Sequence, residues 1–564
     1  MPTPSLPSTQ PVAQAALEQI FDQRYEHEET RDLVALVDDA SELVRTRGEA
    51  AFRDFSVSGS RWRQAETYIF VLDPEGNMLV HADPALEGKN QLDLMDPNGK
   101  PIIRGLLGAA TMVSGKPGGW YHYQWPVPDG LFPRWKSSYV RLVQAPSGKR
   151  YIVGSGMYND RMERAFVIDA VTSAVALIEK RGRASLAALR DPTGPFIAKD
   201  AYIFVIDLDG IELLNPAFRY LEGRNLWDMT DTQGDHPVRD MIEVARTRGS
   251  GWVDYMWPKP GDSISTMKST YVSRASLAGM PVLVGCGVYL AEAPVEARPA
   301  PKFTAAELMA LVRDGAELLA QQGEKAYEEF RERGSTWFHD TTYFFVVTMD
   351  GNMVFHAAEP AREIHHDREL DVLGRPITQM ILDAGASAAG EGWVHYMYPE
   401  PGKVFPVWKS TFVKRVTLPR GEQRLLCCGI YNMQMDKAFI EDVVDHAARL
   451  IAERGKDAFA QLRDKTGPFV FMDTYVFVES PDGTELVNPA QPSFEGRNLM
   501  SLRDLRGKHV VMEEIAAAMK GGSAWLDLYW FKPGANTPAR KQTYVRKVQA
   551  NGDTFIVGSG IYVA

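Results

Sequence analysis

The chain has 564 residues, of which 45% are hydrophobic and 24% are charged, proportions that are usual for a globular protein of several domains. Its formal net charge of −11, without a basic stripe, argues against nucleic-acid binding. No apolar run approaches the ~18 residues of a transmembrane helix, and the opening residues lack the basic and apolar regions of a signal peptide. The sequence therefore predicts no membrane span, no nucleic-acid partner and, by itself, a cytoplasmic location.

One motif occurs four times: a lysine, a hydroxyl residue two positions later, then an aromatic residue and valine. The copies are residues 136–140, 268–272, 409–413 and 541–545. Each is followed by a closing Gly-x-Tyr, at residues 156–158, 287–289, 429–431 and 560–562. A spacing of about 130 to 140 residues is longer than a solenoid repeat and indicates a duplicated domain. The sequence therefore predicts four tandem modules, at residues 28–160, 161–291, 302–432 and 433–564.

Each module is expected to open with an amphipathic helix. In the second module, apolar residues from Phe166 to Ile178 recur mostly at three- and four-residue steps, and Gly182 ends the pattern. A Tyr-x-Phe-Val strand follows, and a turn, Asp-Gly in three modules, leads into a second strand. After a loop and a short helix, three more strands close the module. We therefore expect an α+β module in which a long helix packs on a roughly five-stranded antiparallel sheet.

The modules alternate between two types, and a Pro-rich segment at residues 292–301 separates two similar halves. The second strand ends in histidine in odd modules and in asparagine in even ones: His81, His356, Asn215 and Asn488. The third strand, two residues after its tryptophan, carries histidine in odd modules and aspartate in even ones: His122, His395, Asp254 and Asp527. Because the two positions change together, we expect them to touch or to line one cavity.

In this fixed order, the motifs resemble the single-Cache family of PAS-like sensor modules. The resemblance is carried by the Tyr-x-Phe-Val strand with its Asp-Gly turn, the Gly-Trp-x-x-Tyr-x-Trp-Pro run, the Lys-x-x-Tyr-Val strand and the closing Gly-x-Tyr, and it covers about residues 28–291 and 302–564. It implies a curved sheet with a pocket on one face for a small ligand, often a short carboxylic or amino acid, and a periplasmic location. Family members usually adjoin membrane helices and an output domain, which this sequence does not show.

The lysine and the hydroxyl residue are expected to form the anion end of that pocket. Residues two apart on a strand share a face, and an ammonium beside a hydroxyl suits a carboxylate. The four pairs are Lys136 and Ser138, Lys268 and Thr270, Lys409 and Thr411, and Lys541 and Thr543. The alternatives are an exposed strand lysine and a buried lysine paired with an internal carboxylate such as Asp254.

Aromatic residues of the third strand are expected to form the pocket wall, with core packing as the alternative. The candidates are Tyr123 and Trp125, Tyr255 and Trp257, Tyr396 and Tyr398, and Tyr529 and Trp530. In module four the tyrosine is shifted by one position. Arg224 and Arg497, from the Glu-Gly-Arg-Asn of even modules, could clamp an anion or lie in an exposed loop.

The alternating polar residues have several possible roles. The histidines could contact a ligand, form a hydrogen-bonded structural pair or, together with His365 and His366, bind a metal ion. Asn215 and Asn488 could contact a ligand or form turns. The cysteines, Cys286, Cys427 and Cys428, are expected to be small buried strand residues.

Taken together, the motifs favour a binding protein over an enzyme, because no phosphate loop, dinucleotide motif or nucleophile motif occurs. We expect an array of sensor modules that binds small carboxylates or amino acids without a cofactor, in two types of pocket. Its output would be a shift in module packing, read by a separate signalling or transport partner. The alternatives are a structural scaffold with degenerate pockets and a metal-dependent enzyme that uses the odd-module histidines.

Overall fold

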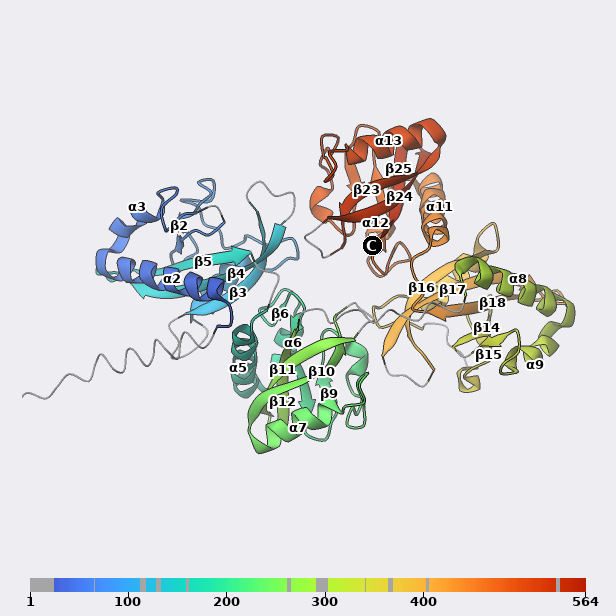
Figure 1. Ribbon diagram of the computed structural model, residues 1–564, viewed down its shortest axis with the longest axis horizontal. Helices are drawn as coiled ribbons and strands as arrows, with labels where there is room; N and C mark the ends of the chain where they lie inside the picture. Colours follow the sequence, from blue (N-terminus) through green and yellow to red (C-terminus); the bar gives the residue numbers. More distant parts are fainter. Residues whose placement is uncertain are drawn as a thin grey trace, which may run out of the picture. The chain divides into compact units, whose positions relative to one another are not determined.

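The computed structural model describes residues 25–64, 66–111, 118–127, 133–158, 162–260, 265–290, 303–339, 341–363, 369–401, 405–533 and 538–563. The chain divides into two compact units between Val295 and Glu296, a boundary inside the Pro-rich segment. Each unit contains two large antiparallel sheets flanked by helices (Figure 1), which have the same strand order, and one two-stranded sheet. A sheet with its helices is called a module below. The four-module α+β fold expected from the sequence is confirmed, and the exact module limits stay a prediction.

The sheets place the last strand of each module in the centre and the Lys strand beside it. In the first unit the orders are β2 (Met78–Val80), β1 (Phe70–Leu72), β5 (Arg150–Tyr158), β4 (Pro133–Gln144), β3 (Gly119–Pro126), and β9 (Glu212–Leu214), β8 (Phe204–Asp207), β12 (Met280–Tyr289), β11 (Ser265–Leu277), β10 (Ser250–Pro258). In the second unit they are β15 (Met353–His356), β14 (Thr342–Thr348), β18 (Gln423–Tyr431), β17 (Pro406–Thr417), β16 (Glu391–Pro399), and β22 (Glu485–Val487), β21 (Phe477–Glu479), β25 (Asp553–Tyr562), β24 (Pro538–Ala550), β23 (Ser523–Phe531). Short additional strands are β13 (Phe338–His339), β6 (Ile197–Ala198) with β7 (Ala201–Tyr202), and β19 (Val470–Phe471) with β20 (Thr474–Tyr475).

A long helix opens every module, as expected. These helices are α2 (Glu28–Arg47), α5 (Arg164–Arg181), α8 (Ala305–Gln322) and α11 (Lys437–Arg454). Short helical turns continue them: η1 (Gly48–Ala51) and α3 (Phe52–Phe55), η2 (Gly182–Ala184) and α6 (Ser185–Arg190), η4 (Gly323–Lys325) and α9 (Ala326–Arg331), and η6 (Gly455–Ala458) and α12 (Phe459–Arg463). Gly182 ends α5 at a φ of 55°, a backbone conformation that favours glycine. Among the described residues, no helix is both long and apolar enough to cross a membrane.

A second helix covers the opposite face of each sheet. These helices are α4 (Ile102–Thr111), α7 (Pro237–Thr247), α10 (Ile377–Ala386) and α13 (Val510–Gly521), and short turns η3 (Arg219–Leu221), η5 (Pro360–Arg362) and η7 (Pro492–Phe494) lie between second strand and helix in modules two to four. In module one, Tyr139 packs in the cluster of α2, whereas its neighbour Val140 packs in the cluster of α4. The sheet is therefore buried on both faces, with the side chains of successive residues pointing to opposite sides.

One aspartate per module, which the sequence analysis overlooked, fixes the loop before this second helix. Asp96 accepts hydrogen bonds from the backbone of Asn98 and Lys100 and, across the module, from Gln124 of β3. The equivalent acceptors are Asp231, Asp371 and Asp504. The loop is thereby tied to the edge strand in all four modules.

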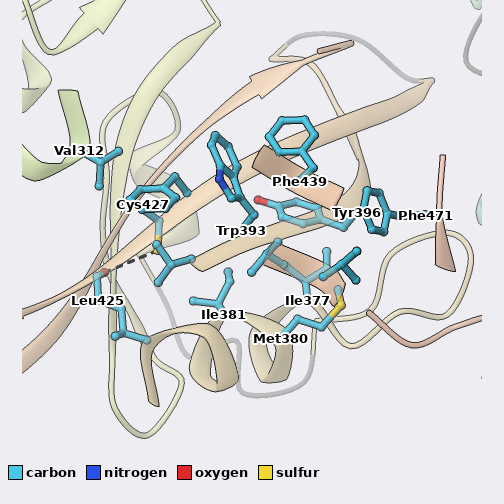
Figure 2. Packing of buried hydrophobic residues seen from close by; sticks show 14 of the residues in the cluster. Val312, Ile377, Met380, Ile381, Trp393, Tyr396, Leu425, Cys427, Phe439 and Phe471 are labelled. Atoms are coloured by element: carbon cyan, nitrogen blue, oxygen red, sulfur yellow. Dashed lines mark hydrogen bonds between the residues drawn. The ribbon is translucent and has the colours of Figure 1, made fainter. Parts of the chain in front are cut away.

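The hydrophobic core of the second unit is continuous between its two modules. Phe439 of α11 lies 4.6 Å from the ring of Trp393 of β16, and Phe471 of β19 belongs to the same cluster (Figure 2). In the first unit, Phe166 of α5 lies 4.6 Å from Trp120 of β3. The three cysteines are buried strand residues, as expected, and all three are free.

A buried cation also joins the two modules of each unit. Lys100, 1% exposed, donates hydrogen bonds to the carbonyl oxygens of Gly194 (2.7 Å) and Ile197 (2.6 Å). Arg375 holds the equivalent place in the second unit and donates to the carbonyl of Val470. These cations satisfy carbonyl groups of the following module that would otherwise be buried without a donor.

Lys100→Met should therefore destabilise the first unit. It leaves two buried carbonyl oxygens without their donor, at a cost of about 1–3 kcal/mol each. Thermal unfolding of the full chain measures the loss. Lys89→Met is the matched control, because Lys89 is exposed and donates one surface hydrogen bond, and it should change stability by less than about 0.5 kcal/mol. Equal effects of the two substitutions would contradict the role assigned to Lys100.

Candidate functional site

The four motif lysines are buried on the second-helix face of their sheets. Lys136, Lys268, Lys409 and Lys541 are 1%, 1%, 2% and 3% exposed. The alternative of a solvent-exposed strand lysine is therefore wrong. Asp254 is exposed and accepts a hydrogen bond from Ser269 at 2.5 Å, so the alternative of a Lys268–Asp254 pair is wrong as well.

Each ammonium group lies between two tyrosine rings. In module one, Lys136 Nζ is 4.0 Å from the ring centroid of Tyr68 and 5.1 Å from that of Tyr158, and it donates to the Tyr68 hydroxyl at 2.8 Å. The same distances in modules two to four are 4.1 and 5.0 Å for Tyr202 and Tyr289, 4.4 and 4.6 Å for Tyr343 and Tyr431, and 4.6 and 5.2 Å for Tyr475 and Tyr562. An electron-rich ring face attracts a desolvated cation by about 2 kcal/mol or more. In the sequence these tyrosines served only to mark the repeated motifs. Their recurrence together with the lysine was the signal that could have identified them as residues of the lysine pocket.

The glycine of each Gly-x-Tyr makes room for the lysine side chain. A Cβ atom added at Gly156 would lie 2.6 Å from Lys136 Cε, and one at Gly287 would lie 2.5 Å from Lys268 Cε. Such distances do not occur between real Cβ atoms and their neighbours. The glycine and the lysine of the repeated motifs are therefore one structural requirement.

The predicted hydroxyl residues face the pocket but bind a tyrosine of the third strand. Ser138 and Tyr123 are joined by a hydrogen bond of 3.0 Å between their hydroxyl groups. The equivalent pairs are Thr270 with Tyr255 (3.0 Å) and Thr411 with Tyr396 (2.9 Å). The structure therefore brings the lysine, hydroxyl and tyrosine candidates together in modules one to three.

Module four departs from this arrangement. Leu528, not Tyr529, stands opposite Lys541 in the strand register, and the neighbouring cavity is lined by Leu528, Trp530, Lys541 and Thr543. Tyr529 points to the other face, where its hydroxyl accepts from Arg506. Its prediction as a pocket residue is wrong because a shift of one position reverses the side of a strand.

The other predicted ring of each third strand reaches the pocket rim. Trp125 packs edge-on to His81 at 5.9 Å, and Trp257 packs edge-on to Phe218 at 6.0 Å. Trp530 donates to the Tyr475 hydroxyl at 3.1 Å. These rings enclose the lysine and leave little space around it.

His81 and His356 lie in the lysine pockets as neutral rings. His81 Nδ1 accepts from the backbone of Asp83, and His356 Nδ1 accepts from that of Glu359, both at 2.9 Å. Burial, reinforced by the nearby lysine, lowers the pKa of His81 to about 4 and that of His356 to about 3. Each ring therefore has an Nε2–H group that can donate a hydrogen bond.

His122 and His395 lie on the opposite face, so the expectation that each shares a cavity with His81 or His356 is wrong. His122 bonds to Ser137 at 2.8 Å and packs on Phe166 of the following module. His395 bonds to Ser410 at 3.0 Å and stacks on Phe471 at 4.1 Å. Asp254 and Asp527 share this face, and Asp527 pairs with Arg540. None of the four residues lies beside a motif lysine.

In even modules, asparagine in the lysine pocket is accompanied by a buried glutamate. Asn215 donates to Glu212 at 3.1 Å and Asn488 donates to Glu485 at 2.8 Å, while each asparagine oxygen also fixes a turn. Odd modules carry Met78 and Met353 at the glutamate position. The sequence contained a signal for this overlooked glutamate. Three positions before the alternating histidine and asparagine, methionine alternates with glutamate from module to module.

Arg224 and Arg497 do not reach the pockets. Both are exposed, and the guanidinium of Arg497 lies over the ring of Phe494. The neighbouring glutamates contribute instead, because Glu222 and Glu495 accept the backbone N–H groups of Asn215 and Asn488. The prediction of an anion clamp at these arginines is therefore wrong.

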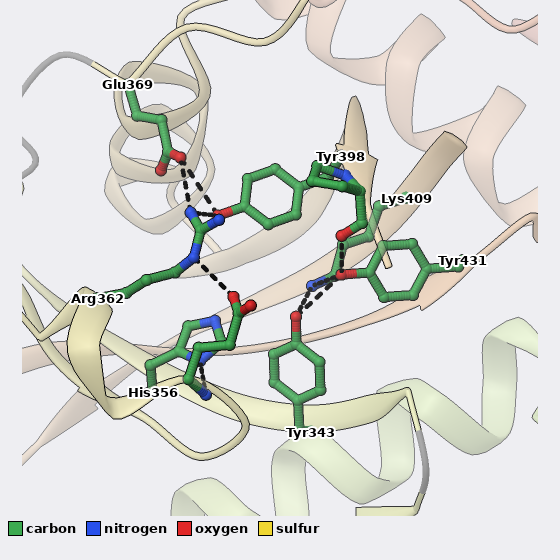
Figure 3. Close-up of polar contacts among 9 residues, drawn as sticks. Tyr343, His356, Arg362, Glu369, Tyr398, Lys409 and Tyr431 are labelled. Carbon is green, nitrogen blue, oxygen red and sulfur yellow. Dashed lines mark hydrogen bonds and ion pairs between the residues drawn. The ribbon is translucent and has the colours of Figure 1, made fainter. Parts of the chain in front are cut away.

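The module-three pocket shows the arrangement most completely (Figure 3). Lys409 donates to Tyr343 at 3.0 Å and to Tyr431 at 3.2 Å. Arg362 bonds to the Tyr398 hydroxyl and pairs with Glu369 at 3.3 Å. The cavity between Lys409, His356, Tyr396, Tyr398 and Glu369 has a volume of about 20 Å³, room for roughly one water molecule.

The charge of these lysines is poorly compensated. None of the four ammonium groups has a carboxylate of the described residues within 4.0 Å. Burial lowers the pKa of Lys136 to about 7 and that of Lys268 to about 8. In modules one and two the cost of desolvating the ammonium group therefore exceeds the stabilisation that the tyrosines provide.

Within the described part of the chain, no group of three or more histidine, cysteine, aspartate or glutamate side chains is arranged to hold a metal ion. His365 and His366 lie outside the described residues. The opposite faces of His81 and His122 remove the geometric basis for a shared metal site.

The family model of the Cache domain matches residues 56–163, 186–418 and 446–564. Two curated proteins are similar over shorter stretches. The sensor histidine kinase MctS of Rhizobium johnstonii is 37% identical over 92 residues, 16% of this chain and 19% of that protein. The methyl-accepting chemotaxis protein McpP of Pseudomonas putida is 31% identical over 97 residues, 17% of this chain and 18% of that protein. The match thus spans about a fifth of the length of these relatives.

Solved structures are similar to parts of the chain. A periplasmic sensor domain of a chemotaxis protein is 31% identical, with a TM-score of 0.20, and the match covers 22% of this chain and 94% of that domain. The ligand-binding domain of the Pseudomonas fluorescens chemoreceptor CtaA, in complex with L-alanine, is 9% identical, with a TM-score of 0.19, over 45% of this chain and 87% of that domain. Likenesses of this size say nothing about the ligand of this chain.

Lys136→Met should change how stability depends on pH. The pKa of Lys136 is about 7 in the folded chain and returns to about 10.4 on unfolding. Between these values the unfolded chain binds more protons, so the contribution of Lys136 makes stability rise with pH. Melting temperatures at about pH 7 and about pH 9.5 measure this rise, which should be smaller in Lys136→Met than in the parent chain. An unchanged pH dependence would show that Lys136 keeps its usual pKa.

Proposed function

We propose, because the chain belongs to the Cache-domain family of PAS-like sensor domains, that it is a small-molecule sensor whose odd modules bind short carboxylates. Lys136 and Lys409 would hold the carboxylate, and the rings around them would form the wall. The finer prediction of carboxylate pockets in all four modules is narrowed to modules one and three. The membership expected from the sequence motifs is itself confirmed by the family match.

The observation that carries this proposal is a buried ammonium group without a carboxylate partner. An isolated buried charge costs several kcal/mol, and the lowered pKa of Lys136 reflects that cost. A bound carboxylate would supply the missing opposite charge and would stabilise the protonated lysine. Binding at neutral pH is therefore expected to take up part of a proton, which is measurable in buffers of different ionisation enthalpy.

The pocket neighbours support a preference for the odd modules. His81 and His356 are neutral donors beside Lys136 and Lys409, and no buried glutamate stands at the positions of Met78 and Met353. In even modules, Glu212 and Glu485 place a buried carboxyl group beside the lysine, and burial raises the pKa of both groups; any negative charge that they carry would oppose an anionic ligand.

The size of the pockets requires movement on binding. A cavity of about 20 Å³ beside Lys409 holds roughly one water molecule, so a carboxylate larger than this must separate Tyr343 from Tyr431 or Tyr398 from Arg362. Such a shift would be the signal, passed on through module packing to a separate signalling or transport partner.

The names of the two curated relatives, a histidine kinase and a chemotaxis protein, agree with this role. Cache domains are typically periplasmic sensor domains, and nothing supports a cytoplasmic location for this chain.

A scaffold with degenerate pockets is the second candidate, and the same small cavity favours it. Tyrosine rings already occupy the space beside each lysine. In a scaffold the lysine would serve only to hold these rings, and its replacement by methionine would raise stability, as often happens when a buried charge is removed.

Isothermal titration of the full chain with short monocarboxylates separates the two candidates. The proposal expects two sites, one of which is lost in Lys136→Met and the other in Lys409→Met, with affinity falling by about tenfold or more because each lost charged hydrogen bond is worth about 1.5–3 kcal/mol. Lys414→Met is the matched control, because Lys414 lies on the same strand and pairs with Glu391 on the other face. No binding by the parent chain, together with stabilised methionine variants, would establish the scaffold instead.

A further inference from the structure

Module four differs from the other three by two more carboxylates in its pocket. Glu479 of β21 and Glu514 of α13 are 1% and 4% exposed. Glu479 pairs with the residue of the last strand that lies six positions before the closing tyrosine. The residues with the same pairing in the other modules are apolar: Leu72, Ile206 and Val347. Glu514 lies ten residues after the loop aspartate Asp504. The residues at the same distance from the loop aspartates of the other modules are also apolar: Leu106, Met241 and Ile381. Both carboxylates therefore stand where the fold needs only apolar side chains.

With Glu485, these residues surround Lys541 with three buried carboxyl groups. Full ionisation would leave an excess of negative charge in a buried site, which is costly. Glu479 and Glu514 line the same buried cavity, and two neighbouring carboxyl groups avoid mutual repulsion when one of them keeps its proton. Burial and mutual repulsion raise the pKa of all three glutamates, so the pocket keeps protons at neutral pH.

One acceptor in this pocket is unused. Glu479 Oε2 is buried and has no hydrogen-bond partner among the described residues. It borders a cavity of about 20 Å³ that is also lined by Tyr475, Phe477 and Trp530. An open carboxylate oxygen inside aromatic walls offers a cation both hydrogen-bond acceptors and ring faces.

We propose that the module-four pocket binds a primary ammonium group, with Glu479 and Glu514 as its acceptors and the aromatic rings as its wall. The cavity has the size of such a group, which is close to that of a water molecule. A divalent metal fits less well, because the described carboxylates do not form a metal-ligand cluster. The inference does not depend on carboxylate binding in the odd modules, since it concerns different residues and the opposite charge.

Proton balance follows from the proton that the Glu479–Glu514 pair keeps. The arriving cation replaces this proton, so about one proton is released for each cation bound and the charge of the pocket is unchanged. The other charged groups that act on the site are Lys541, Glu485, Asp473, Glu495 and Glu513. While this proton stays bound in the free protein, affinity should rise about tenfold per pH unit.

Titration of the full chain with methylammonium chloride tests the proposal, at constant ionic strength and in buffers of different ionisation enthalpy. We expect one site, release of about one proton and an affinity that rises from about pH 6 to about pH 8. Tetramethylammonium, which has no N–H group, and sodium should bind at least about tenfold more weakly, since the acceptors would remain unpaired.

Variants of Glu479 locate the site. Glu479→Gln and Glu479→Ile should each lower methylammonium affinity by about tenfold or more. The isoleucine variant should fold, because module two has Ile206 at this position. Glu453→Gln is the control, since Glu453 of α11 is exposed and does not line the pocket; it should change affinity by less than about twofold.

Three results would overturn the inference: no methylammonium binding by the parent chain, unchanged binding by folded Glu479→Ile, or tetramethylammonium binding as tight as methylammonium binding. Lys136→Met and Lys409→Met should bind methylammonium like the parent chain. Failure of the carboxylate titration would therefore leave this test intact, and failure of this test would leave the carboxylate sites untouched.

Discussion

The buried ammonium group of each motif lysine dictates the side chains around it. The lysine stem crosses a glycine that cannot carry a Cβ atom, and its charged end lies between two tyrosine rings. The closing tyrosine is held in turn by a carbonyl of the third strand, as Tyr289 is by Pro258 at 2.6 Å. Ring faces and one phenol hydrogen bond return a few kcal/mol, which is less than the cost of desolvation, as the lowered pKa of Lys136 shows. A negatively charged group bound in the pocket would therefore stabilise the ammonium group further.

The neighbours of the lysine decide how many carboxyl groups the pocket itself supplies. In odd modules a methionine and a neutral histidine stand beside it and add no charge. In module two, Glu212 adds one carboxyl group, hydrogen-bonded to Asn215. In module four, Glu485, Glu479 and Glu514 place three carboxyl groups in the pocket of Lys541. A constant lysine with variable neighbours thus gives pockets with different numbers of carboxyl groups in one fold.

The fold and the burial of the lysines follow from local sequence rules, whereas much of the site does not. Strand alternation correctly placed Lys136 and Ser138 on one face, and the four-fold repeat fixed the order of elements. The role of Tyr68 was missed because its strand is distant in sequence from the lysine strand, and only the register with β5 brings the two together. Glu479 and Glu514 were missed because a single charged residue in a strand or helix pattern reads as an exposed position. Their burial depends on which face meets the sheet, which one sequence does not specify.

The paired histidines show why residues that change together need not touch. His81 and His356 differ from Asn215 and Asn488 because odd modules carry methionine, not glutamate, three residues earlier, where an asparagine would find its acceptor. His395 differs from Asp527 for another reason: it stacks on Phe471 and lies beside Phe439, both from the next module.

Asp254 and Asp527 face no such aromatic contact; they are exposed or half-exposed and bind Ser269 and Arg540. A buried charged carboxylate against Phe471 would be unpaired, and a flat neutral ring is not. The residue type at each position thus depends on whether its module comes first or second in a unit. At the end of the second strand it depends on the pocket, and in the third strand it depends on the contact between modules. Their correlation has a common cause in that order, and no direct contact is needed to explain it.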